Sequence, residues 1–264
     1  MNSALKTILW YSKRPRLYPE LMRDVRAKYA RRACAPDTQA EATCWCNEGA
    51  LTTTEAIAEI TGMTTFEPVR DRFRDIFDRA EEIVQRCPVK MGGASNLDLL
   101  FWICEHLRAT NVIETGVAYG WSSLVILLSL RNRDDAILVS TDMPYLKRNN
   151  DAHVGCVVPE QLRSKWQILA CADREALPKA LKMLPSIDMC HYDSDKSYEG
   201  RTWAYALLWE ALRPGGIFIS DDIGDNLAFH DFCSKLNQYP VIVCTPASTG
   251  TKHAGMLVKT SDES

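Results

Sequence analysis

The spacing of apolar positions changes near residue 90 and divides the chain into two regions. Before this point apolar residues recur with the period of a helix that buries one face. The predicted helices of this region span Glu20–Arg32, Thr53–Ile60 and Pro68–Gln85. After the break at Cys87–Pro88, short apolar runs alternate with helical segments. We therefore predict a helical N-terminal extension over residues 1–90 and one α/β domain over residues 91–264.

The second region has the pattern of a doubly wound parallel sheet, in which strands and covering helices alternate. Its predicted strands are 111–115, 136–141, 166–170, 187–192 and 216–220, with helices near 121–131, 173–184 and 198–212. Ser95–Asp98 resembles a capping box that opens a helix ending near Arg108. Leu227–Leu236 is predicted to be helical, and Val241–Cys244 and Met256–Lys259 to close the sheet as an antiparallel pair. The expected architecture is a seven-stranded Rossmann-like α/β fold.

The turn after the first of these strands carries the clearest binding signal. An apolar strand runs into Glu114, then into Gly116 and Gly120, and a new helix begins at Trp121. Glycines let the backbone approach a ligand, and a helix N-terminus offers free N–H groups to a carboxylate or phosphate. Ala118 breaks the G-x-G-x-x-G pattern of dinucleotide-binding proteins, and the acid would repel a pyrophosphate. S-adenosylmethionine fits better, because its cationic groups can sit near the acid and its carboxylate near the helix start.

Acidic residues follow four of the predicted strands, at the edge where open α/β sheets bind ligands. Asp142 is placed to accept hydrogen bonds from ribose hydroxyls and Asp173 from an adenine amino group, although a helix N-cap explains Asp173 equally well. Asp193, Asp221 and Asp222 follow two strands that we expect to be neighbours. Three adjacent carboxylates repel one another, and a divalent cation such as Mg²⁺ or Mn²⁺ would neutralise them.

Together the glycine turn and the later acids resemble the metal-dependent O-methyltransferases of the class I, S-adenosylmethionine-dependent type, such as catechol and caffeoyl-CoA O-methyltransferases, over residues 91–259. The cofactor residues predicted from the strand ends and this resemblance are Glu114, Gly116, Tyr119, Gly120, Trp121, Ser122, Asp142, Asp173 and Asp193. The implied metal ligands are Asp193, Asp221 and Asp222, although that group usually has Asn at the last position. The segments 191–200, 212–216 and 220–222 are more similar to macrocin-type bacterial enzymes of sugar and polysaccharide pathways, which implies a sugar or glycan hydroxyl as acceptor.

A sugar hydroxyl is too weakly acidic to ionise near neutral pH, so a base must remove its proton. Lys196 stands where the resemblance to catechol O-methyltransferase places the catalytic lysine, although macrocin-type enzymes commonly have His there. His230, on the helix after the acid-rich loop, is the second candidate. Nearby carboxylates raise the pKa of a lysine, so a bound cation has to offset them if Lys196 is the base.

The composition sets limits on location and redox state. The chain has 264 residues, 46% of them hydrophobic, but no run approaches the roughly 18 apolar residues of a membrane span. We expect a cytoplasmic protein whose ten cysteines are reduced, because most of them interrupt apolar strands and helices. Cys34, Cys44 and Cys46 form a denser group, yet C-x-C without a nearby histidine lacks the usual spacing of a zinc site.

Charge is distributed unevenly, although the net charge is only −3. Residues 1–35 carry nine Lys and Arg side chains against Glu20 and Asp24, interleaved with apolar residues. This basic arm could contact an anionic membrane surface or an acidic partner, or it could cover the catalytic domain, because Pro15 and Pro19 interrupt a long amphipathic helix. We expect residues 1–85 to cap the acceptor side or to form a dimer contact.

Three other interpretations remain to be weighed. One is a metal-independent methyltransferase for a small amine or acid, and another is a non-catalytic cofactor-binding scaffold of a glycan-assembly complex. Nucleic-acid methylation is disfavoured, because the catalytic region is acidic where a phosphate backbone would approach. Within the loop 144–159, polar side chains are candidates for contacts to the acceptor, namely Tyr145, Lys147, Arg148, Asn149, Asn150 and His153.

Overall fold

The computed structural model describes residues 9–31, 38–143, 150–247 and 250–261. Its centre is one eight-stranded sheet with the order β1-β7-β8-β6-β5-β2-β3-β4. The strands are β1 (Ala50–Leu51), β2 (Asn111–Thr115), β3 (Ile137–Thr141), β4 (Trp166–Leu169), β5 (Ile187–Tyr192), β6 (Leu212–Ser220), β7 (Val241–Ala247) and β8 (Gly250–Val258). All neighbours pair in parallel except β8, which runs antiparallel to β6 and β7. The carboxyl ends of β2 to β6 therefore meet at one edge.

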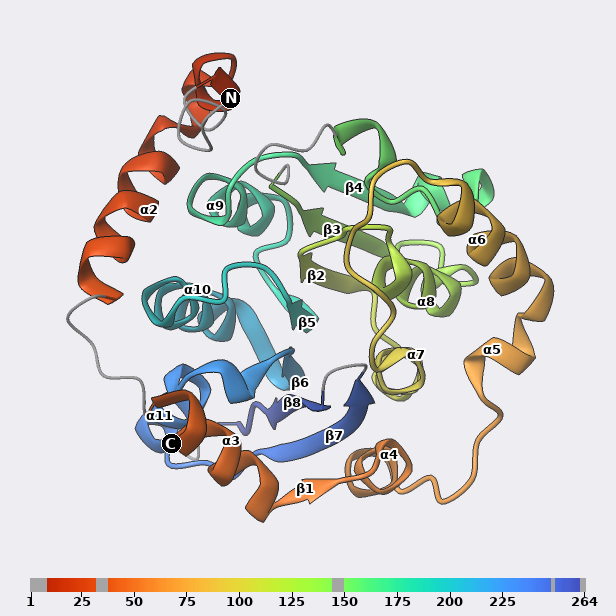
Figure 1. Cartoon of the computed structure of the whole chain (residues 1–264). Coiled ribbons are helices and arrows are strands. Elements are labelled where there is room, and N and C mark those ends of the chain that lie inside the picture. The colour runs from red at the N-terminus through yellow and green to blue at the C-terminus, as the bar shows by residue number, and fades with distance from the viewer. Residues whose placement is uncertain (1–8, 32–37, 144–149, 248–249, 262–264) are drawn as a thin grey trace.

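Helices cover both faces of this sheet (Figure 1). On one face lie α7 (Leu97–His106) and α8 (Trp121–Leu130), and on the other lie α9 (Asp173–Met183), α10 (Tyr198–Ala211) and α11 (Ala228–Leu236). Helix α8 is buried along nearly its whole length, which explains why its sequence is apolar on all sides. Short 3-10 turns η2 (Asp151–His153), η3 (Glu160–Lys165) and η4 (Ile223–Asp225) connect the remaining elements.

The N-terminal region is mostly helical, as predicted, but part of it joins the sheet. It contains η1 (Pro15–Leu17), α2 (Tyr18–Arg31), α3 (Thr38–Glu48), α4 (Thr53–Thr61), α5 (Val69–Arg72) and α6 (Arg74–Arg86). Strand β1 pairs with β7, so the sheet has eight strands where seven were predicted. The two residues of β1 are too few to show an alternating pattern in the sequence. They form a strand because they pair with β7. The division at residue 90 stays a prediction.

Two local expectations were wrong. Asn96 at the start of α7 has a φ of 50° and makes no capping hydrogen bond, and Asp98 instead accepts the backbone N–H of Val69 at 2.6 Å. The predicted capping box is thus replaced by a tie between α7 and α5. The connection predicted between the last two strands is shorter than expected. Most of its residues belong to β7 and β8, because they pair with each other through backbone hydrogen bonds.

Candidate functional site

A cavity of about 510 Å³ opens at the carboxyl ends of the parallel strands. Residues that follow β2, β4, β5 and β6 line it, because parallel strands end at the same edge of a sheet. The predicted site residues on its wall are Gly116, Trp121, Ser122, Asp173, Asp193, Lys196, Asp221 and Asp222. The structure thus brings the larger part of the predicted cofactor and acid residues into one cavity.

Gly116 and Gly120 form the close turn that follows β2. Gly116 has a φ of 80°, and a Cβ atom there would lie 2.2 Å from the carbonyl oxygen of Asp193. Gly120 has a φ of 93°, and a Cβ atom there would lie 2.9 Å from the Cα of Gly155. Both positions require glycine, because positive φ strains other residues and because backbone already fills the space. The turn is therefore pressed against β5 on one side and exposed to the cavity on the other.

Asp142, at the end of β3, supports this turn. Its Oδ1 accepts the backbone N–H groups of Val117 at 2.8 Å and Ala118 at 3.3 Å. Burial raises the pKa of Asp142 to about 6, and these two hydrogen bonds oppose the rise. In the described part of the chain, Met143 rather than Asp142 lines the cavity here. The carboxylate predicted to bind ribose thus holds the cofactor turn, and its contact with ribose stays a prediction.

Asp173 is the first residue of α9, and its side chain does not cap the helix. The N-cap residue is Ala172. Oδ1 of Asp173 accepts the hydroxyl of Thr141 at 3.0 Å, and its Oδ2 accepts the hydroxyl of Ser194. The N-cap explanation is therefore wrong, since the carboxylate instead ties the end of β3 to the end of β5. Burial raises the pKa of Asp173.

Glu114 lies beneath the cavity and is fully buried. Its Oε2 accepts hydrogen bonds from Ser123 and Ser140. His191 stands between the two acids, with Nδ1 3.8 Å from Glu114 and Nε2 3.7 Å from Asp221. Burial alone would lower the pKa of His191, but the two carboxylates raise it to about 10. His191 thus joins the buried Glu114 to the cavity wall, which His191 itself lines, and direct contact between Glu114 and a cofactor stays a prediction.

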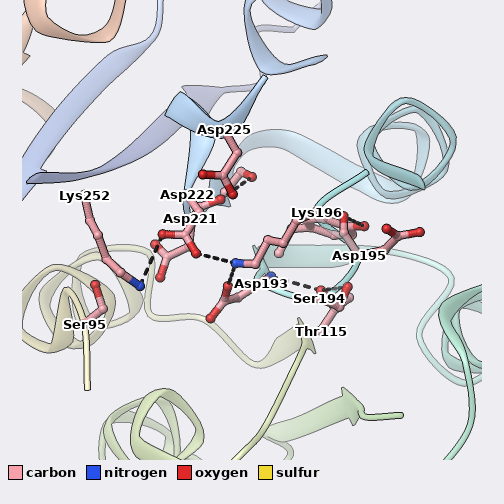
Figure 2. A network of polar contacts seen from close by, with 12 residues as sticks. Ser95, Thr115, Asp193, Ser194, Asp195, Lys196, Asp221, Asp222, Asp225 and Lys252 are labelled. Carbon is pink, nitrogen blue, oxygen red and sulfur yellow. Dashed lines mark hydrogen bonds and ion pairs between the residues drawn. The ribbon is translucent and has the colours of Figure 1, made fainter. Parts of the chain in front are cut away.

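Two lysines compensate the predicted metal ligands (Figure 2). Nζ of Lys196 contacts Asp193 and lies 2.6 Å from Oδ2 of Asp222. Lys252 of β8 approaches the other oxygen of Asp222 at 3.3 Å. Burial would lower the pKa of Lys196, but the two carboxylates raise it. The lysine in turn lowers the pKa of Asp222 against the effect of burial.

The three carboxylates are paired with other side chains and do not form a ligand cage in the described residues. Asp221 faces His191 and accepts the amide of Asn96 at 3.2 Å, while Asp193 and Asp222 face Lys196. No group of three or more metal-binding side chains converges within the residues that the structure describes. In this arrangement the residues do not fit a divalent cation, because ammonium groups already supply the charge that the prediction assigned to the metal. Metal binding stays a prediction.

Arg201, on α10, fixes the turn that carries two of the acids. Its side chain is completely buried, and its Nη2 donates to the carbonyl oxygens of Asp222 at 2.8 Å and Asp221 at 3.3 Å. Asp222 has a φ of 53°, which is a strained conformation for a residue other than glycine. A buried guanidinium thus holds a strained turn in place at the cavity wall.

Several candidate residues lie elsewhere. His230 on α11 packs edge-on against Trp45 and lies 2.9 Å from Asp231, so it does not line the cavity. Tyr119 donates its hydroxyl to the carbonyl oxygen of Val89 at 2.9 Å and faces away from the wall. Asn150 is buried and His153 borders a different cavity. The remaining loop candidates, Tyr145, Lys147, Arg148 and Asn149, lie outside the described residues.

Sequence reasoning missed four residues at the acid side: Lys252 and Ser95 line the cavity, Asn96 donates to the Asp221 carboxylate, and Arg201 donates to the carbonyl oxygens of the acid turn. Lys252 had a usable signal, since β8 runs antiparallel to β6 and must start where β6 ends. The pairing of Ser220 with Gly255 shows this register. Asn96 and Arg201 had none, because their partners are distant in sequence.

The basic arm packs at the end of the cavity formed after β3 and β4. Trp10, Tyr11 and Leu17 cluster with Ala172, and Met143 packs against this group. Glu20 of α2 lines the cavity. We predict the adenosine at this end of the cavity, and the expected cap over the acceptor side or dimer contact stays a prediction. Contact of the arm with a membrane or an acidic partner stays a prediction.

The dense cysteine group does not form a site in the described residues. Cys44 is exposed and Cys46 is buried, where burial raises its pKa to about 12. Cys34 lies outside the described residues. None of the helices described is both long and apolar enough to cross a membrane.

The sequence between the first predicted strand and the acid turn matches a known family. Residues 113–223, which run from β2 to η4, match the family model described as a methyltransferase domain. The matched residues are similar to a methyltransferase domain. This segment contains the glycine turn, Asp142, Asp173, Lys196 and the acid wall, so the predicted class of enzyme is confirmed. No curated protein sequence matches the chain.

Solved methyltransferase structures share the fold over most of the chain. A putative O-methyltransferase from Klebsiella pneumoniae has a TM-score of 0.54 and 15% identity, and the match covers 82% of this chain and 100% of that one. TomG from Streptomyces achromogenes in complex with SAM has a TM-score of 0.55 and 14% identity, and the match covers 79% of this chain and 97% of TomG. The O-methyltransferase from Bacillus cereus in complex with SAH has a TM-score of 0.54 and 13% identity, and the match covers 78% of this chain and 98% of that one. Identities this low show the fold, and the predicted Rossmann-like methyltransferase fold is confirmed.

Proposed function

We propose that this methyltransferase domain transfers a methyl group from S-adenosylmethionine to the oxygen of an acceptor hydroxyl. One observation carries the proposal: a single cavity joins the glycine turn after β2 to a wall on which Asp193, Lys196 and Asp222 meet. A cofactor turn and a charged acceptor wall are the two parts that the reaction needs. O-methyltransferases with SAM or SAH bound are among the structures that share the fold, which supports the same cofactor here.

The proposed cofactor pose follows from the wall. The adenosine would lie toward Met143, Ala172 and Asp173, where burial and apolar contacts are available. The amino-acid part would lie along Gly116, with its carboxylate at the start of α8 near Ser122. The methyl group would then point toward the acid wall, where the acceptor oxygen must align with the methyl–sulfur axis.

The acceptor is proposed to be a sugar or glycan hydroxyl. The wall beyond the cofactor offers a hydroxyl, a carboxylate and an ammonium group, from Ser95, Asp222 and Lys252, and such a set of donors and acceptors suits a polyhydroxylated molecule. Lys196 is the proposed base. Its two ion pairs keep it protonated, so an incoming group has to take over at least one of the carboxylates before the lysine can accept a proton.

Two forms of the reaction are carried forward. Metal-assisted transfer is the form expected from the sequence, although within the described residues Asp193, Asp221 and Asp222 are paired with other side chains and do not form a ligand cage. The pairing of Lys196 and Lys252 with Asp222 favours metal-independent transfer, because the acids are compensated without a cation. The experiment below separates the two.

The test combines labelled S-adenosylmethionine with a panel of nucleotide sugars, glycosides, small amines and carboxylic acids, in excess Mg²⁺ or in excess chelator. Label on a sugar hydroxyl, found by mass spectrometry, is the expected result. Label on amines or acids alone would overturn the proposed acceptor, and full activity in chelator would exclude metal assistance. Cofactor binding without transfer to any member would favour the scaffold interpretation. Gly116→Val is the negative control, because a side chain there would overlap the backbone of Asp193.

A further inference from the structure

A second cavity lies at the opposite edge of the sheet from the methyl-transfer cavity. It has a volume of about 330 Å³, and its lining includes Arg72, Arg108, Arg131 and Arg133. Arg108 precedes β2, and Arg131 and Arg133 precede β3, so the cavity sits at the amino ends of strands whose carboxyl ends form the first cavity. Among the residues that the structure describes, the two linings have none in common. We call this second cavity the arginine pocket.

The arginine pocket carries uncompensated positive charge. Glu105 is the one carboxylate among the described lining residues, and it already accepts Nη2 of Arg133 at 2.8 Å and the hydroxyl of Ser129. Four guanidinium groups therefore face one carboxylate. Burial and the neighbouring charges of Arg72 and Arg133 lower the pKa of Arg131, while Glu105 opposes them. Gathering like charges costs free energy that a bound anion would offset.

Helix capping accounts for two of the arginines but not for the other two. Arg133 donates to the carbonyl oxygen of Ala109 at 3.0 Å, and Arg131 donates to that of Leu128. Such contacts are common where cations meet the negative ends of helices. Within the described part of the chain, the side chains of Arg72 and Arg108 have no hydrogen bond or ion pair. Arg72 lies 5.9, 5.7 and 5.4 Å from the ring centroids of Phe73, Phe101 and Trp102, and these contacts use none of its N–H donors.

We propose that the arginine pocket binds a diphosphate group. Guanidinium forks hold phosphate oxygens in pairs, and several forks around one small cavity suit a compact ligand with more than one negative charge. The described residues of the lining include no aromatic ring that could stack on a nucleobase. Recognition should therefore end at the phosphates, so inorganic pyrophosphate and the diphosphate of a nucleotide should bind alike.

Isothermal titration calorimetry of the full chain at low salt tests this. Pyrophosphate should bind with a stoichiometry of one, ADP with similar affinity and orthophosphate more weakly. Arg72→Gln with Arg108→Gln should weaken pyrophosphate binding by roughly a hundredfold, about tenfold for each lost charged contact. Both side chains are exposed and have no hydrogen bond or ion pair with the described residues, so the fold should be kept although Arg72 loses its contacts with three aromatic rings. Arg86→Gln is the matched control, because Arg86 is an exposed helical arginine outside the pocket.

Three results would overturn the proposal. The first is no binding of millimolar pyrophosphate by calorimetry or thermal shift, and the second is an equal loss of affinity in the Arg86→Gln control. The third is competition between pyrophosphate and S-adenosylmethionine, which would place the phosphates in the methyl-transfer cavity. Binding of ADP far tighter than that of pyrophosphate would overturn the restriction to phosphates. Because binding is measured without turnover, failure here leaves the proposed methyl transfer untouched.

Discussion

The two ends of the methyl-transfer cavity hold their carboxylates by different means. At the end formed by β2, β3 and β4, neutral donors hold Asp142 and Asp173, and burial raises the pKa of both acids. At the end formed by β5, β6 and β8, the ammonium groups of Lys196 and Lys252 hold Asp222 and lower its pKa. Neutral donors fix geometry without cancelling charge, whereas ion pairs cancel charge and can be exchanged for another partner. We therefore call the first the fixed end, because its carboxylates keep their geometry, and the second the exchangeable end, because its ion pairs can change partners.

The largest effect is expected at the exchangeable end. Lys196→Met removes the ammonium group while keeping an unbranched side chain. If Lys196 is the base, kcat should fall by about 10² to 10⁴, which is the usual contribution of such a group. Cofactor affinity should survive, since the hydrogen bonds of Asp142 and Asp173 do not involve this lysine. Steady-state kinetics and calorimetry measure the two quantities separately.

Lys252→Met is the matched control, because it deletes an equal charge that also faces Asp222 but is more exposed. It should lower kcat far less than Lys196→Met does. Equal losses in the two variants would mean that the wall needs only positive charge, and a change below about threefold in Lys196→Met would remove it as the base. His230→Asn should have no effect, since His230 does not line the cavity.

An intermediate effect is expected at the fixed end. Asp142→Ala removes the acceptor for two backbone N–H groups of the cofactor turn. Its affinity for S-adenosylmethionine should fall by roughly 1 to 3 kcal/mol, the scale of losing hydrogen bonds to a charged group. Calorimetry without metal or acceptor measures this, and Asp142→Asn keeps one acceptor oxygen as the control. An unchanged affinity in Asp142→Ala would show that the turn keeps its conformation without the Asp142 carboxylate.

The raised pKa of Asp142 allows its role at the fixed end to be tested by changing the pH. Because the pKa rises from 3.8 to about 6, the native state favours the protonated acid. Its contribution to stability is therefore fully present below pH 3.8 and is lost as the pH rises through about 6. If the cofactor needs the ionised form, affinity should fall as the pH drops below about 6. Asp142→Asn should flatten this dependence, and a wild-type affinity constant from pH 5 to pH 8 would contradict the assignment.

The smallest effect is expected from the basic arm. Removing residues 1–31 uncovers Ala172 and takes Glu20 from the cavity. Because Glu20 is the one lining residue in the described part of the arm, cofactor affinity should fall by no more than a few-fold. Glu20→Gln in the full chain separates the lost charge from the lost packing. A large loss of cofactor affinity in the truncated chain would make the arm part of the fixed end.

Much of the fold could be predicted because its signals are local. The strands that become β2, β3, β4 and β5 were placed within a residue or so, since buried parallel strands are short apolar runs between turns. Strand β1 and the length of the hairpin β7–β8 could not be placed, because pairing with a neighbour makes them strands. The capping box before α7 failed for the same reason, as Asp98 has a tertiary partner in Val69.

For the site, the sequence by itself determined which residues stand at strand ends and therefore at one edge. Gly116, Asp193 and Asp222 were found in this way, because the direction of a parallel sheet fixes where its strands finish. Only the tertiary structure decided what each side chain faces. It buried Glu114 under the cavity, gave Asp142 to the cofactor turn and set Lys196 among the acids. The physical reason is that the charge state of a buried acid depends on donors and cations brought from distant parts of the chain, and the order of residues does not contain those distances.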